Sequence, residues 1–268
     1  MQVLDGRSLA SQMQVKLKKQ LTKSGSFEAF LVGSDPASIL YLRKKAEMAE
    51  EVGVAFHLHT YTTKNNTAQV VAKIQELNAD KSVSGIMVQL PVPRGFDSDE
   101  IVNAILPSKD ADGLTDSSIA GGEVLPATAE GVIQILKHYK IAWKDKRVVL
   151  IGFTRLLNVP LSVYLAKTGA RVAVLQKNTK TFAELKSADI IITAAGEANL
   201  FSAKDIKTGA VIIDAGTNQL RGKLVGDADY NSVIKKAFAV TPVPGGVGPM
   251  TVVSLFWNLA KLVESAGK

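Results

Sequence analysis

The spacing of apolar residues predicts alternating helices and strands over the first half of the chain. Four apolar residues recur every four positions and predict an amphipathic helix that ends near Ser24-Gly25: Leu9, Met13, Leu17 and Leu21. Strand-like apolar runs follow at 29–33, 54–60 and 85–91, with helices between them. The helix after Asn66 starts with a capping-box pattern, since Gln69 follows three residues later. This order predicts one α/β domain with a parallel sheet.

The second half of the chain repeats short apolar strands followed by turns and helices. A helix is predicted at 128–138, and strands are predicted at 146–152, 171–175, 188–196 and 210–216. Repeated strand–turn–helix units of this length are typical of a doubly wound, Rossmann-type nucleotide-binding domain. We therefore expect two α/β domains. The catalytic domain spans 1–120 plus a C-terminal helix at 250–268 that packs back on it, and the cofactor domain spans 121–249.

Composition limits the class of protein but does not identify a function. The chain has 268 residues, 46% of them hydrophobic, which is enough for a buried core. It has no cysteine, which excludes disulfides and thiolate chemistry, and it shows neither a signal peptide nor a membrane span. We expect a soluble cytoplasmic protein without a metal centre. The net charge of +7 comes from scattered Lys and Arg with few aromatics, which favours small anions over nucleic acid as ligands.

A helix at 38–49 carries the first candidate chemistry. Tyr41 and Lys45 are four residues apart and share one helix face, and Ser38 lies on the same stripe. A hydroxyl, a phenol and an amine would then line one wall. The simpler interpretation is a solvated helix face with an incidental Tyr–Lys pair.

Gln89 is unusual because it lies at the carboxyl end of an otherwise apolar strand, just before Pro91. Ligands of open α/β sheets bind at the carboxyl ends of the strands. A structural amide that fixes the proline-rich loop is the alternative. The charged loop at 107–113 is open to the same two interpretations, a site loop or a solvated turn.

The dinucleotide signal is weak, because the segment after the strand at 146–152 is not G-x-G-x-x-G. Lys177 follows the next strand, where an acidic residue would bind the ribose of NAD. Together with Arg155, Lys177 would instead suit the 2′-phosphate of NADP. Simple exposure of Lys177 is the alternative.

Near the end, the segment 241–251 is rich in Gly and Pro and precedes a helix, which fits either a ligand rim or a tight connection.

Four segments together resemble the bifunctional methylenetetrahydrofolate dehydrogenase/cyclohydrolase family over essentially the whole chain. They are Asp35-Pro36-Ala37-Ser38 with Tyr41 and Lys45, Val88-Gln89-Leu90-Pro91 with Pro93, Lys109-Asp110-Ala111-Asp112-Gly113, and the glycine-rich segment 241–251. The resemblance implies oxidation of 5,10-methylenetetrahydrofolate with NADP (or NAD) and hydrolysis of the product to 10-formyltetrahydrofolate. It also implies a folate site between two domains and a homodimer.

The resemblance also implies roles for individual residues. Lys45 would be catalytic, Gln89 would bond it, Tyr41 would stack on or position the substrate, and Asp112 would hold the pterin. The remaining substrate-binding residues would be Ser38, Val88, Leu90, Pro244, Gly245, Gly246, Val247 and Gly248. The cofactor-binding residues would be Gly152, Phe153, Thr154, Arg155, Lys177 and Thr217.

The residue types suit this chemistry. A folate nitrogen lone pair expels the hydride, so that step requires no general base, and none of the three His lies in these segments. Hydrolysis requires a proton acceptor, and a Lys of lowered pKa can serve. Gln89 can bond the amine without adding charge.

The departures from the family pattern lie in the cofactor half. Where the family has Gly-Arg-Ser-x-x-Val-Gly, this chain has Phe153 in place of the Arg and Asn158 in place of the second Gly. Asn tolerates positive φ, so we expect the turn to survive. An alternative is a cyclohydrolase alone, with an altered or lost cofactor site. A non-enzymatic folate- or nucleotide-binding regulator is a second alternative.

Overall fold

The computed structural model describes residues 1–179 and 183–267, which form two compact units. The three-stranded unit comprises 12–127 and 252–268, and the six-stranded unit comprises 1–11 and 128–251. The sequence places residues 1–11 in the first domain. The structure assigns them to the six-stranded unit, because β1 (Gln2–Val3) pairs in parallel with β11 (Ala239–Val240) at the edge of the larger sheet.

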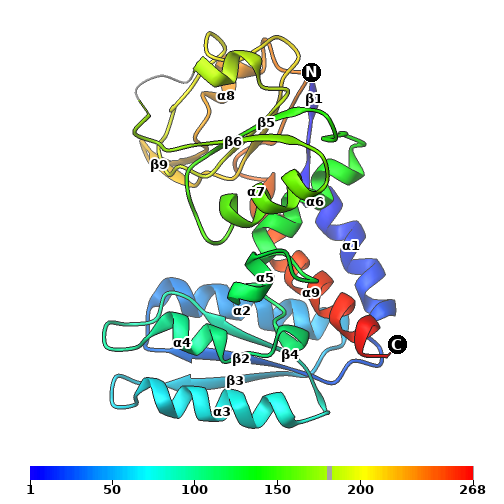
Figure 1. Cartoon of the computed structure of the whole chain (residues 1–268), viewed down its shortest axis with the longest axis vertical. Coiled ribbons are helices and arrows are strands. Elements are labelled where there is room, and N and C mark those ends of the chain that lie inside the picture. Colours follow the sequence, from blue (N-terminus) through cyan, green and yellow to red (C-terminus); the bar gives the residue numbers. More distant parts are fainter. Residues whose placement is uncertain (180–182, 268) are drawn as a thin grey trace. The chain divides into compact units, whose positions relative to one another are not determined.

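The three-stranded unit is built on a parallel sheet in the order β3-β2-β4. Its strands are β2 (Ser26–Val32), β3 (Phe56–Tyr61) and β4 (Val83–Gln89). Its helices are α2 (Pro36–Val52), α3 (Thr67–Ala79), α4 (Ser98–Asn103), α5 (Asp116–Ile119), the 3-10 turn η1 (Pro107–Lys109), and most of α1 (Gly6–Gln20) and α9 (Val247–Ala266). Figure 1 shows α3 on one side of this sheet and α2 on the other. The predicted strand–helix alternation is confirmed.

Helix α2 begins and ends where its sequence requires. The Asp35 carboxylate accepts a hydrogen bond from the Ser38 backbone N–H at 2.8 Å, and Pro36 occupies the first turn. Gly53 ends the helix in the left-handed conformation with φ of +79°, which costs a glycine little. These two caps fix the position along the helix axis of each α2 side chain that faces the sheet.

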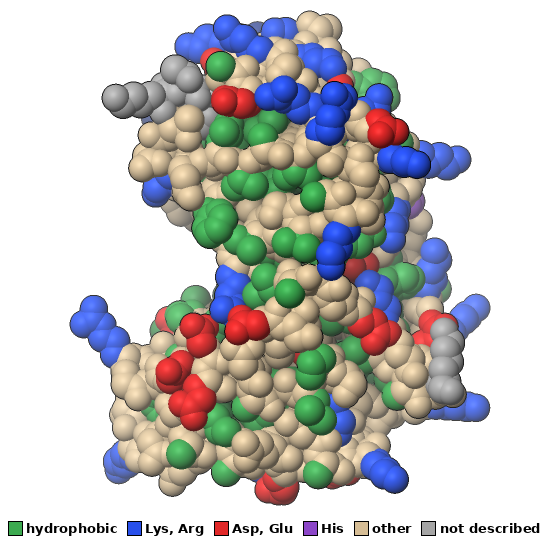
Figure 2. Space-filling view, in the orientation of Figure 1, with side chains coloured by type: hydrophobic (Ala, Val, Ile, Leu, Met, Phe, Trp, Pro, Cys, Tyr) green, Lys and Arg blue, Asp and Glu red, His purple; other side chains and the backbone are tan. Residues whose placement is uncertain are grey.

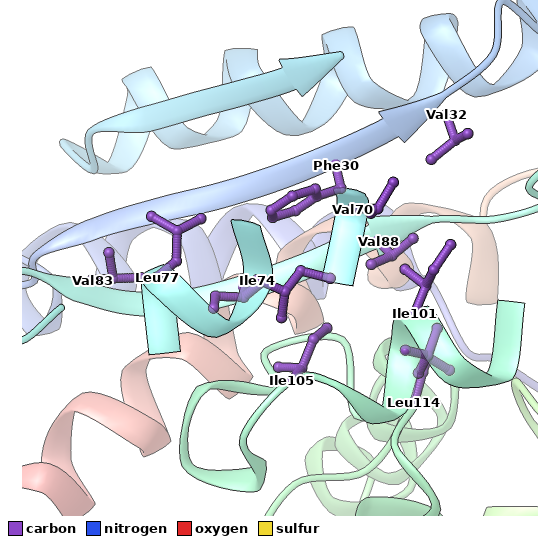
Figure 3. Close-up of a cluster of buried hydrophobic side chains, with 12 residues drawn as sticks. Phe30, Val32, Val70, Ile74, Leu77, Val83, Val88, Ile101, Ile105 and Leu114 are labelled. Atoms are coloured by element: carbon purple, nitrogen blue, oxygen red, sulfur yellow. The ribbon is translucent and has the colours of Figure 1, made fainter. Parts of the chain in front are cut away.

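One face of this sheet forms a hydrophobic core with α3 and α4 (Figure 3). Phe30 and Val88 project from neighbouring strands toward Val70 and Ile74 of α3, and all four are at most 2% exposed. Burial of each such side chain stabilises the fold by about 1.5–3 kcal/mol relative to exposure. The core explains why α3 carries its apolar residues at helical spacing.

The opposite face of the same sheet is covered by α2 and α9. Phe27 of β2 makes an edge-on contact with Phe256 of α9, with ring centroids 5.6 Å apart. Gly85 of β4 lies close against α9, because a Cβ there would be 2.6 Å from the Leu259 side chain. The prediction that the C-terminal helix packs on the first domain is therefore confirmed.

The six-stranded unit contains a parallel sheet in the order β1-β11-β8-β7-β5-β6. Its other strands are β5 (Arg147–Ile151), β6 (Arg171–Leu175), β7 (Ile190–Thr193) and β8 (Val211–Asp214). It also contains α6 (Ala127–His138), α7 (Asn158–Lys167), the 3-10 turn η2 (Ala183–Ser187), α8 (Tyr230–Val233) and the hairpin β9 (Asn218–Leu220) and β10 (Lys223–Val225). The strand order reverses at β5, whose neighbours are β6 and β7. A doubly wound sheet has its ligand crevice at such a point.

The surface and helix lengths add two observations. On the face drawn in Figure 2, Lys and Arg side chains lie at many separate places, with Asp and Glu between them. Among the described residues, no helix has both the length and the apolar character needed to cross a bilayer.

Candidate active site

Lys45 is a buried amine on the sheet-facing side of α2. It is 8% exposed and shares that side with Leu42 and Ala49, which pack in the interior. A lysine is almost never this buried without partners, because removing an ammonium group from water is costly. The contacts of its Nζ atom therefore help to identify the role of Lys45.

Two neutral acceptors on β4 contact the Lys45 amine. Nζ donates to Gln89 Oε1 at 3.0 Å and lies 3.5 Å from Met87 Sδ. Residues 87 and 89 share one face of the strand because side chains alternate along it. The Gln89 amide is itself fixed, since its Nε2 donates to the Leu90 carbonyl at 2.8 Å. The amide oxygen is thus turned toward the lysine.

Asp112 supplies a carboxylate near the same amine without a direct hydrogen bond. Its Oδ2 lies 3.9 Å from Lys45 Nζ, and its side chain is 17% exposed. The neighbouring Asp110 holds the loop in place, accepting from the backbone N–H groups of Gly113, Leu114 and Thr115 and from the Ser118 hydroxyl.

Asn258 of α9 also anchors the loop that carries Asp112. Its Nδ2 donates to the carbonyls of Ala111 at 3.0 Å and Leu125 at 2.7 Å. The position of Asp112 therefore depends on a helix almost 150 residues away in the sequence, as the spacing of 147 between Asn258 and Ala111 shows.

The electrostatics of this cluster favour its uncharged forms. Burial lowers the pKa of Lys45, and the nearby Asp112 opposes that change. Burial also raises the pKa of Asp112, an effect that Lys45 opposes and Asp110 reinforces. Because Gln89 and Met87 carry no charge, neither stabilises the ammonium form as a carboxylate would. The cluster therefore favours the neutral lysine, the form that can accept a proton.

The structure separates the residues of the predicted α2 wall. Ser38 and Lys45 are buried, whereas Tyr41 is 53% exposed and its ring lies 5.8 Å from Lys44 Nζ. The interpretation of the whole stripe as a solvated face is wrong for Ser38 and Lys45. Tyr41 is the one member of the three whose side chain is open to solvent in the structure.

Val88 and Leu90 do not share the face of Gln89. Val88 is 2% exposed within the core against α3 (Figure 3), and Leu90 packs against the same cluster. The prediction that both bind substrate therefore does not hold for the Val88 side chain, because alternate strand residues point to opposite faces.

The six-stranded unit has a close backbone approach at its strand-order reversal. Gly152 follows β5 with φ of +104°, and a Cβ there would lie 2.5 Å from the Ala194 carbonyl. Glycine alone fits this turn, which leaves the backbone accessible to a ligand at the crevice. This is the feature of the described chain that best fits a dinucleotide.

The expectation that Asn158 adopts positive φ is wrong. Asn158 is the first residue of α7, is fully buried, and donates through Nδ2 to the carbonyls of Ile151 at 2.8 Å and Gly152 at 3.1 Å. Its side chain therefore ties the helix to the end of β5. The turn survives through this amide rather than through left-handed backbone.

The other predicted cofactor residues surround the turn or follow neighbouring strands. Phe153 is 64% exposed, and Thr154 Oγ1 accepts weakly from the Asn158 backbone N–H at 3.4 Å. Lys177 and Thr217 are exposed just after β6 and β8. Arg155 is partly buried. The side chains at 153 and 177 are thus accessible to a ligand.

Two buried carboxylates organise the loops at the same end of this sheet. Asp227 accepts from the Thr193 hydroxyl, the Ala195 and Glu197 backbone N–H groups and the Asn218 amide, at 2.7 to 3.1 Å. Asp214 accepts three backbone N–H groups, and burial raises its pKa to about 6. These residues fix the segments that follow β7 and β8.

The glycine-rich segment divides between a turn and a helix. Gly245 has φ of +117° and accepts from the backbone N–H groups of Gly6 and Arg7 through its carbonyl. Val247 and Gly248 were predicted in the loop but begin α9. Pro249 fits there, because a first-turn residue needs no backbone donor. Pro244 is exposed, and Gly245 and Gly246 are buried.

Sequence reasoning missed several residues that the structure places at these sites. They are Met87, Asp110, Asp214, Asp227 and Asn258. Met87 had an available signal, because it lies two residues before Gln89 on a predicted strand. Asp110 had a signal as well, because its partners lie three to eight residues further along the charged loop. Asp214, Asp227 and Asn258 had none, since most of their partners come from distant segments of the chain.

Comparisons with known proteins cover both units. The catalytic-domain model of tetrahydrofolate dehydrogenase/cyclohydrolase matches residues 4–112, and its NAD(P)-binding-domain model matches residues 126–267. Bifunctional protein FolD of Lactobacillus helveticus is 40% identical over 98% of this chain and 97% of its own.

Solved structures give the same result. The bifunctional FolD enzyme of Campylobacter jejuni matches with a TM-score of 0.94 and 36% identity, covering 99% of each chain. The FolD of Trypanosoma brucei, solved with NADP and an inhibitor, matches with a TM-score of 0.90 and 28% identity, covering 99% of this chain and 98% of its own. These matches span both units and give no support to a cyclohydrolase alone. The chain belongs to the tetrahydrofolate dehydrogenase/cyclohydrolase family.

Proposed function

We propose that this enzyme oxidises 5,10-methylenetetrahydrofolate to 5,10-methenyltetrahydrofolate with NADP and then hydrolyses the product to 10-formyltetrahydrofolate. The observation that carries this proposal is the buried Lys45 amine, held by the neutral acceptor Gln89 at 3.0 Å. The family match of both units supports the pairing of hydride transfer with hydrolysis.

The oxidation needs little from the side chains. A folate nitrogen lone pair forms the new C=N bond as hydride leaves the methylene carbon, so no proton is removed in this step. NADP, when bound, accepts that hydride. The chain contributes orientation, through the glycine turn at Gly152 and the loops that Asp227 fixes.

The hydrolysis needs a base. Water adds to the cationic methenyl carbon, and neutral Lys45 takes a proton from that water as the C–O bond forms. The hydroxyl of the adduct then loses its proton to solvent as the C=O bond of the formyl group forms and one ring C–N bond breaks. The departing nitrogen takes back the proton held by Lys45, so that one proton is released overall. The substrate cation further favours the neutral amine before the attack.

Further substrate contacts follow from the positions of the side chains in the three-stranded unit. Asp112 is proposed to bond the pterin, and the exposed Tyr41 ring to stack on the substrate. Ser38 is proposed to support the amine's helix, and Val88 and Leu90 to act through their backbone. The segment Pro244, Gly245, Gly246, Val247 and Gly248 remains a predicted substrate contact.

The cofactor-binding residues are proposed to be Gly152, Phe153, Thr154, Arg155, Lys177 and Thr217. Gly152 permits close approach, and Lys177 is placed after β6 where a 2′-phosphate is bound in this fold class. A single cation at this place favours NADP over NAD.

We further propose a cytoplasmic homodimer that binds neither nucleic acid nor membranes. Sedimentation would test the dimer, and salt-dependent RNA retention would test nucleic-acid binding.

One coupled assay tests the proposal. Purified protein with 5,10-methylenetetrahydrofolate and NADP should form NADPH and methenyl product, and should hydrolyse added 5,10-methenyltetrahydrofolate faster than buffer does. Replacement of NADP by NAD in the same assay compares the two cofactors. Absence of reduction with both cofactors would refute the dehydrogenase, and hydrolysis no faster than buffer would refute the cyclohydrolase.

A further inference from the structure

Met87 contacts the proposed catalytic lysine, although no role is assigned to it by the family pattern discussed above. Its Sδ atom lies 3.5 Å from Lys45 Nζ, and its side chain is fully buried. The contact is defined by secondary structure on both sides, because Met87 lies within β4 and Lys45 within α2.

A neutral lysine amine has two N–H groups and one lone pair, whereas the ammonium has three N–H groups. The structure offers two neutral acceptors at hydrogen-bond distance, Gln89 Oε1 at 3.0 Å and Met87 Sδ at 3.5 Å. The number of acceptors therefore matches the number of donors of the neutral form.

We propose that Met87 is a positioning residue for Lys45, whose thioether takes one N–H of the neutral amine while Gln89 takes the other. The lone pair is then left free to accept the proton of the attacking water. This inference rests on the proposed role of Lys45 in hydrolysis.

The chemistry of the thioether fits this role better than other side chains would. Sulfur is a weak, uncharged acceptor, so it orients the amine without stabilising the ammonium as a carboxylate would. A leucine of similar volume would fill the space without accepting. Because side chains alternate along β4, residues 87 and 89 both face the amine, whereas Val88 faces the core formed with α3 and α4 on the opposite side of the sheet.

Charged groups near the amine come from the loop that follows η1. Asp112 lies 3.9 Å from Nζ, and Asp110 acts on Asp112. Both remain in place when Met87 is changed, since Asp110 is held by four donors and none of them is Met87. A change at 87 therefore isolates the thioether.

The test compares Met87→Leu with Met13→Leu, a matched change at another buried methionine of the same unit. Rates of methenyl hydrolysis are measured against pH on the full chain, and the Lys45 titration is followed by NMR of the 13Cε signal. Met87→Leu should lower kcat about three- to tenfold and move the Lys45 midpoint down by roughly half a pH unit, because the ammonium loses an acceptor. Met13→Leu should change neither.

A second measurement needs no substitution at 87. The methyl 13C signal of Met87 in the unmodified enzyme should shift with pH at the same midpoint as Lys45, and the signal of Met13 should not. This keeps the proposal testable where Met87→Leu does not fold.

The outcomes separate the two proposals. An unchanged pH profile and an unchanged Lys45 midpoint in folded Met87→Leu would overturn the positioning role, as would a Met87 methyl signal that ignores the Lys45 titration. Full hydrolysis by Lys45→Met would instead overturn the proposed function, whatever Met87→Leu does.

Discussion

Asp227 in the six-stranded unit and Lys45 in the three-stranded unit are buried with opposite kinds of partners. In the six-stranded unit, the Asp227 carboxylate accepts four hydrogen bonds at 2.7 to 3.1 Å. In the three-stranded unit, the Lys45 amine has two neutral acceptors, and the nearest carboxylate lies 3.9 Å away. Both groups are buried, but only the aspartate is hydrogen-bonded by several donors.

This difference separates a structural group from a reactive one. A carboxylate surrounded by donors holds its loops in place, whereas a buried amine without a bonded counter-ion is driven toward its neutral form. The departures from the family pattern fall in the six-stranded unit, at Phe153 and Asn158. We therefore expect substitutions at the lysine site to change the reaction rate, and substitutions at the aspartate site to lower the free energy of unfolding.

The largest expected effect is on hydrolysis by Lys45→Met. Loss of the base should lower the rate of methenyl hydrolysis about 10²- to 10⁴-fold, while hydride transfer, which needs no base, persists. Stopped assays of each half-reaction measure the two rates separately.

The control is Lys23→Met, an exposed lysine of the same unit. It should retain both activities. Equal hydrolysis by wild type and Lys45→Met would remove the reactive side of the comparison and revive a binding protein without turnover.

The next effect concerns stability in the six-stranded unit. Asp227→Ala removes the acceptor of four donors and should lower the free energy of unfolding by about 3 kcal/mol, or the unfolding temperature by about 10 °C. Calorimetry measures this change.

Asp112→Asn is the counterpart in the other unit. Its carboxylate accepts no hydrogen bond from the described residues and burial favours its neutral form, so exchange for an amide should cost less stability than Asp227→Ala does. A larger loss from Asp112→Asn than from Asp227→Ala would reverse the comparison.

Gln89→Glu should change the pH dependence of hydrolysis. Burial lowers the pKa of Lys45, and a carboxylate in place of the neutral amide 3.0 Å from Nζ would raise it. Because the base must be neutral, the acidic limb of the pH–rate profile should move to higher pH. Activity at pH 7 should fall about tenfold for each unit of that shift and recover at higher pH.

The control for this pH effect is Gln20→Glu, which adds the same charge at an exposed position on α1. Its profile should match that of the wild type. A Gln89→Glu profile that loses amplitude without moving would show that the amide contributes by shape rather than by lack of charge.

The smallest expected effect is on cofactor choice. Lys177→Ser should raise the KM for NADP about tenfold and leave the KM for NAD within about twofold, because only NADP carries the 2′-phosphate. Lys186→Ser, at an exposed lysine of the same unit, is the control. An equal change for both cofactors would place the phosphate elsewhere and weaken the link between Lys177 and NADP.

Most of the fold could be predicted from the sequence, because periodicity depends on local geometry. The 3.6-residue repeat of α1 and α3 and the apolar runs of the parallel strands are the same whatever the rest of the chain does. The pairing of β1 with β11 could not be predicted in this way, since two strands of two residues carry no periodic signal. The pairing forms only when β11, far away in the sequence, has joined the six-stranded sheet next to β8 and offers its free edge to β1.

Sequence and tertiary structure each determined part of the candidate site. The sequence by itself specified that Lys45, Gln89 and Asp112 are present and that Lys45 lies on a helix and Gln89 at a strand end. Only the tertiary structure brought the Gln89 oxygen within 3.0 Å of the amine, added Met87 and turned Tyr41 to solvent. The physical reason is that hydrogen bonds and burial depend on separations in space between segments, which residue order does not encode directly.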